Sequence, residues 1–65
     1  MNKRQLKATH EDIENALEIL PKLYRNYKEQ TETQHKVALM IAIEHGARDI
    51  VQESMALQAH YLHNS

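Results

Sequence analysis

The chain has 65 residues with 8 basic and 9 acidic side chains, so its formal net charge is −1, and it contains no cysteine, one glycine and one proline. Disulfides and thiolate metal sites are therefore excluded, and the balanced charge argues against an electrostatic nucleic-acid binder. A chain this short forms at most one domain with a small core, so a partner subunit is the expected source of additional stability.

The N-terminal segment, residues 1–8, is predicted to be a flexible basic arm that precedes a single helical domain over residues 9–62. Thr9 has the character of an N-cap, because the acidic side chains of Glu11 and Asp12 follow it. Acidic side chains in a first helical turn interact favourably with the helix dipole. The sequence therefore predicts that the first helix begins at Thr9.

Apolar residues after this cap recur at alternating spacings of four and three, which predicts an amphipathic helix that runs to about Lys28. The residues of this stripe are Ile13, Leu17, Leu20, Tyr24 and Tyr27. Pro21 lies inside the helix and removes one backbone hydrogen bond. No capping residue precedes Pro21, so we expect a kink at this point and not two separate helices.

The second helix is predicted over residues 32–62, after a link at residues 29–31. Thr31 and Gln34 have the spacing of a capping box, which marks the beginning of a helix. A link this short makes the two helices antiparallel neighbours. The last residues, 63–65, are expected to be frayed.

Two apolar stripes run along the second helix. The first consists of Met40, Ile43, Ala47, Ile50, Ser54, Leu57 and Tyr61, and the second of Val37, Ile41, Val51, Met55 and Leu62. The first stripe keeps its phase across Gly46, where a turn would usually reset it. We therefore expect one long helix, with a bend allowed at Gly46. Two separate helices that meet at Gly46 are the alternative.

The two predicted helices differ in length, which bears on whether the chain needs a partner. At 1.5 Å per residue the predicted helices are ~28 Å and ~46 Å long, so the first would cover only half of the second. Two copies would bury the remaining apolar surface as a four-helix bundle, so the predicted fold is an all-α helical hairpin that forms a homodimer. The predicted interface residues are Met40, Ile43, Ala47, Ile50, Val51, Ser54, Met55, Leu57 and Tyr61. A turn at Gly46 would instead allow a monomeric three-helix bundle.

The sequence contains no motif that points to catalysis. There is no glycine-rich phosphate loop and no recognisable nucleophile setting. Ser54 is expected to donate to the carbonyl of Ile50 or to let two helices approach closely. Glu32 and His35 have the spacing used in di-metal helical bundles, but one hairpin supplies only one such motif, so neither a metal nor a cofactor is expected. His45, which flanks the first stripe, is the candidate pH-sensitive residue: if it lies at the subunit contact, its protonation should weaken association near pH 6.

The expected function is therefore a non-enzymatic protein–protein interaction module, an adaptor or regulator that acts as a homo-oligomer. The longest apolar run, residues 37–43, is too short to span a bilayer, so a cytoplasmic protein without a membrane segment is expected. The alternative is a helix-turn-helix DNA-binding regulator with helices around residues 32–45 and 49–62. Nucleic acid is disfavoured as a partner because residues 50–59 carry no Lys or Arg for phosphate contacts.

Overall fold

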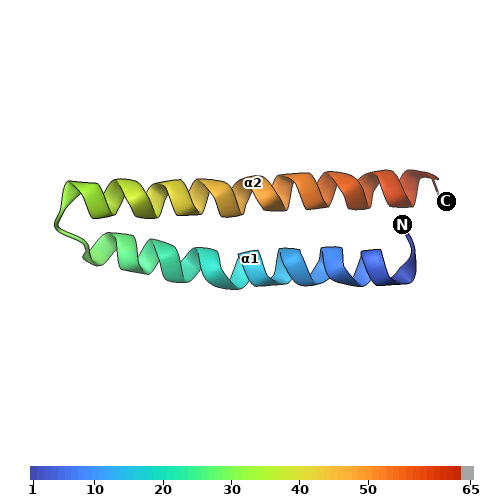
Figure 1. Ribbon diagram of the computed structural model, residues 1–65, viewed down its shortest axis with the longest axis horizontal. Helices are drawn as coiled ribbons and strands as arrows, with labels where there is room; N and C mark the ends of the chain where they lie inside the picture. Colours follow the sequence, from blue (N-terminus) through green and yellow to red (C-terminus); the bar gives the residue numbers. More distant parts are fainter. Residues whose placement is uncertain (64–65) are drawn as a thin grey trace.

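The computed structural model describes residues 1–63 and contains two antiparallel helices, α1 (Lys3–Glu29) and α2 (Thr33–His63). Residues 30–32 connect them, and the N-terminal end of the chain lies beside the C-terminal end of α2 (Figure 1). The hairpin is a thin rod with extents of 49 × 14 × 13 Å. The predicted all-α helical hairpin is therefore confirmed.

The beginning of α1 differs from the prediction. Asn2 is the N-cap: its side-chain oxygen accepts a hydrogen bond from the backbone N–H of Gln5 at 2.8 Å, and the Gln5 side chain accepts one from Asn2 at 3.1 Å. This reciprocal pair satisfies two backbone donors at the helix end, so residues 3–8 form helix and not an arm outside it. The predicted N-cap at Thr9 is wrong, because its hydroxyl lies within the helix and donates to the carbonyl of Gln5 at 2.8 Å.

Because α1 begins at Lys3, it is longer than the sequence predicted. With 27 residues α1 is about 40 Å long, and with 31 residues α2 is about 46 Å long. The two helices therefore run side by side along almost their whole length (Figure 1). The expectation that α1 would leave the C-terminal half of α2 uncovered is wrong, because it placed the beginning of α1 too late.

Both helices are continuous at the residues that break helices most often. Pro21 lies inside α1, which confirms a single helix there. Gly46 lies inside α2, which confirms one long helix and leaves no turn for a three-helix bundle or for helix-turn-helix units at 32–45 and 49–62. A Cβ atom added to Gly46 would lie 2.8 Å from Leu20 Cδ2 and 3.5 Å from Leu20 Cγ. Glycine thus allows the two helices to approach closely at this level.

The ends of α2 lie near their predicted positions. The carbonyl of Glu32 accepts the hydrogen bond of the Lys36 N–H at 3.1 Å, as an N-cap carbonyl does. The N-cap of α2 is therefore Glu32, whereas the capping-box spacing predicted Thr31. At the other end His63 belongs to α2, whereas the rest of the predicted frayed tail, residues 64–65, lies outside the described residues.

Candidate interaction surface

The contact between the helices, here called the seam, consists of half-buried residues spaced alternately three and four apart. On α1 they include Leu6, Ile13, Ala16, Leu20, Leu23 and Tyr27, and on α2 they include Leu39, Ile43, Gly46, Ile50, Leu57 and His60. Such spacing places side chains along one side of a helix, as in a coiled coil. Because Gly46 contacts Leu20, this side of α2 is the one that faces α1.

The seam does not form a closed core. Among the described residues no apolar side chain is buried, and the one buried residue is Thr9, which is 7% exposed. Each helix has a single neighbour, so every seam residue keeps part of its surface in water. The hairpin alone therefore leaves many large apolar side chains exposed to water, although burial of apolar surface is the main driving force of folding.

A second line of residues, here called the outer stripe, runs along α2 on the side away from the seam. Its apolar members are between 49% and 76% exposed. The stripe consists of Val37, Ile41, Glu44, Arg48, Val51, Met55 and Leu62. A helix that is apolar on two opposite sides is typical of a helix with neighbours on both sides. In the hairpin α2 has a neighbour on only one.

Two charged residues lie in the middle of the outer stripe. Glu44 Oε1 lies 3.6 Å from Arg48 Nη2, and both side chains are largely exposed. The two charges are opposite and one helical turn apart, so they partly neutralise each other. The outer stripe is thus apolar towards both ends and carries a balanced ion pair at its centre.

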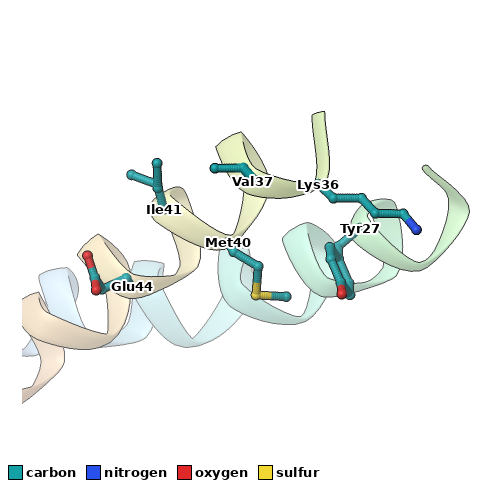
Figure 2. A pocket seen from close by; sticks show the side chains of 6 residues that line it. All are labelled: Tyr27, Lys36, Val37, Met40, Ile41 and Glu44. Carbon is teal, nitrogen blue, oxygen red and sulfur yellow. The ribbon is translucent and has the colours of Figure 1, made fainter. Parts of the chain in front are cut away.

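A hollow of about 320 Å³ lies beside the outer stripe near the link between the helices. Its lining residues are Tyr27 of α1 and Lys36, Val37, Met40, Ile41 and Glu44 of α2. Figure 2 shows that Val37 and Ile41 project away from α1, whereas Met40 extends towards it. The hollow is therefore mainly apolar, with a charged group at each end.

The predicted interface residues fall on two different sides of α2. Ile43, Ile50, Ser54 and Leu57 are half-buried, whereas Met40, Ala47, Val51, Met55 and Tyr61 are exposed. The Ser54 hydroxyl donates to the carbonyl of Ile50 at 2.6 Å, which confirms the predicted hydrogen bond. Glu44 and Arg48 were not among the predicted residues, although they continue the spacing of Val37 and Ile41 and could have been found by it.

Two of the histidines, His45 and His35, concern roles that the sequence suggested. His45 is exposed on α2, so its predicted role in a pH response stays a prediction. His35 Nε2 lies 3.7 Å from Glu32 Oε2, so the two residues of the metal-like motif are near each other at the beginning of α2. Within residues 1–63 no group of three His, Asp or Glu side chains is arranged to hold a metal ion.

Comparisons with known proteins add no assignment. No protein-family model, curated protein or solved structure matches this chain. Over residues 1–63, neither α1 nor α2 has the length and apolar character needed to cross a bilayer. The arrangement of side chains on α2 is therefore the main indication of function.

Proposed function

We propose that this chain is a non-enzymatic protein–protein interaction module that associates with itself through the exposed apolar residues of α2. The single observation that carries the proposal is that α2 is apolar on two sides while the described part of the hairpin buries no apolar side chain. Contiguous exposed apolar residues are typical of surfaces that bind other proteins. An adaptor or regulator is the functional class that fits a small helical module of this kind.

The exposed area supports association. The accessible surface of the hairpin is 5297 Å². A compact monomer of 7.6 kDa would expose about 4,300 Å², so each chain exposes roughly 1,000 Å² more than expected. A standard protein–protein interface buries about 800 Å² per partner. One interface of ordinary size would therefore bring each chain close to the exposed area of a compact protein.

A helix surface of this kind binds a groove or another helix by means of side chains three and four residues apart. Self-association comes first in this proposal, because a two-helix hairpin of this size has only a marginal core of its own. Further protein partners would then bind the assembled bundle. A cytoplasmic location is part of the proposal and is supported by the absence of cysteine from the chain.

The direct test is the mass of the purified chain by size-exclusion chromatography with light scattering. We expect a dimer or larger assembly, and a monomer of 7.6 kDa at high micromolar concentration would overturn the proposal. The variant Val51→Glu places a charge on the outer stripe, where 55% exposure lets the isolated hairpin tolerate it. It should lower the mass to that of a monomer, because a charge buried in an interface without a partner is strongly destabilising.

The neighbouring residue provides a matched control. Ile50 is half-buried in the seam. Ile50→Glu should therefore unfold the hairpin and remove its helical circular-dichroism signal, whereas Val51→Glu should retain more of that signal at the same concentration. If the two variants lose helix equally, and if folded Val51→Glu has the same light-scattering mass as the unmodified chain, then the outer stripe does not mediate association.

A further inference from the structure

The outer stripe has an internal symmetry about the level of Gly46. Six of its seven residues form pairs at equal distances from this level, whereas the position that mirrors Leu62 is residue 30, which lies outside α2. The pairs are Val37 with Met55, Ile41 with Val51, and Glu44 with Arg48. Two of the pairs join apolar residues, and the third joins opposite charges. Such a pattern is what two identical antiparallel helices require, because each residue then faces its counterpart and not itself.

Building on the proposed self-association, we infer that the partner on this surface is a second copy of the chain, packed antiparallel along α2 with the two-fold axis level with Gly46. In this register apolar side chains of one copy face apolar side chains of the other. Glu44 faces Arg48 of the partner subunit, and the same pair recurs on the other side of the axis. The alternating spacing of the stripe is that of a coiled-coil seam, so the two α2 helices can interdigitate along it.

Other registers of the same two helices match poorly. A shift by one heptad in one direction brings Arg48 opposite Val51 and Glu44 opposite Met55. A shift in the other direction brings Glu44 opposite Ile41. A parallel pair places Glu44 against Glu44 and Arg48 against Arg48. Each alternative buries a charge against an apolar side chain or against a like charge, which is unfavourable.

The hollow shown in Figure 2 agrees with this register. Four of its lining residues, Val37, Met40, Ile41 and Glu44, have the spacing of the four positions that form a hole in coiled-coil packing. Their centre lies near the level of Ile41, so the side chain that reaches it in the inferred dimer is Val51 of the partner subunit. Two-fold symmetry gives each dimer two such contacts.

Single cysteine variants test the direction and register, since the chain has no cysteine of its own. Ile41→Cys and Val51→Cys face each other in the inferred dimer, so an equimolar mixture should form a disulfide-linked dimer under mild oxidation. Each variant alone should be linked at least several-fold less. In the antiparallel register two copies of residue 41 are ~15 Å apart along the axis, beyond the usual disulfide reach of about 7 Å between Cα atoms.

Control variants distinguish disulfide formation within the inferred dimer from disulfide formation by random encounters between chains. A mixture of Ile41→Cys with Glu18→Cys, an exposed position on α1, should be linked no faster than either variant alone. Under reducing conditions every variant should have the light-scattering mass of the unmodified chain. If Ile41→Cys or Val51→Cys fails that check, the pair Val37→Cys and Met55→Cys supplies the same test farther from the axis.

The outcomes distinguish this inference from the proposed function. Linkage of Ile41→Cys alone as fast as that of the mixture would overturn the antiparallel arrangement. A dimer in solution without preferential linkage of the mixed variants would overturn the register or the face, while leaving self-association intact. A monomer in solution would overturn both. Preferential linkage of both mixed pairs would support the inferred dimer.

Discussion

The close contact between Gly46 and Leu20 gives a quantitative test of how the two helices pack. In Gly46→Ala the new methyl group would lie 2.8 Å from Leu20 Cδ2, so the Leu20 side chain must move. Alanine gains about 1 kcal/mol of helix propensity over glycine, whereas forcing a side chain off its rotamer costs about 0.5–1.5 kcal/mol. We expect the two terms to offset each other, so that Gly46→Ala changes the free energy of unfolding by less than about 0.5 kcal/mol.

The same substitution should behave differently once Leu20 is shortened. Leu20→Ala removes the methyl groups that Gly46→Ala would meet. In this background Gly46→Ala should stabilise the hairpin by the full helix-propensity term of about 1 kcal/mol. The coupling free energy between the two positions should thus be roughly 1 kcal/mol, within the range for residues in direct contact.

The assay is urea unfolding followed by circular dichroism, with all variants at one protein concentration, because the stability of an oligomer depends on concentration. Leu17→Ala serves as the control background, because Leu17 is exposed and does not lie near Gly46. Gly46→Ala should have the same effect there as in the unmodified chain. Equal stabilisation by Gly46→Ala in the Leu20→Ala and Leu20 backgrounds would refute the contact and with it the alignment of the two helices.

Further predictions concern the ends, the proline and the charges. Asn2→Ala should lower the free energy of unfolding by about 1 kcal/mol, since the capping box is lost, and an unchanged urea midpoint would contradict that role of Asn2. Pro21→Ala should raise it by as much as about 3 kcal/mol, because alanine restores a helical N–H, and a lower midpoint would show that proline is required there. Glu44→Lys should weaken association, since it replaces the ion pair with Arg48 by like charges, and the loss should shrink in high salt. A light-scattering mass that does not depend on salt or on this substitution would argue against a charged contact.

Much of the secondary structure was determined by the sequence itself. The spacing of apolar residues, the lack of a capping residue before Pro21 and the unbroken phase across Gly46 predicted two helices with a short link, and two helices are observed. These signals are local, because each depends on residues within one or two helical turns. The beginning of α1 was predicted wrongly because two local capping signals compete there. The capping box of Asn2 and Gln5 forms in the structure, whereas the acidic residues after Thr9 favoured Thr9 as the cap.

The tertiary structure decided which side of α2 is covered. The first stripe read from the sequence includes Met40 and Ala47, whereas the seam includes Leu39 and Gly46, one position earlier on the helix. Periodicity shows that a helix has an apolar side, but it does not show where a neighbouring helix will lie on a broad apolar surface. The close approach at Gly46 favours this side, because glycine leaves room for Leu20 in its observed position. That choice turns the outer stripe of α2 towards solvent and makes it the candidate surface for a partner.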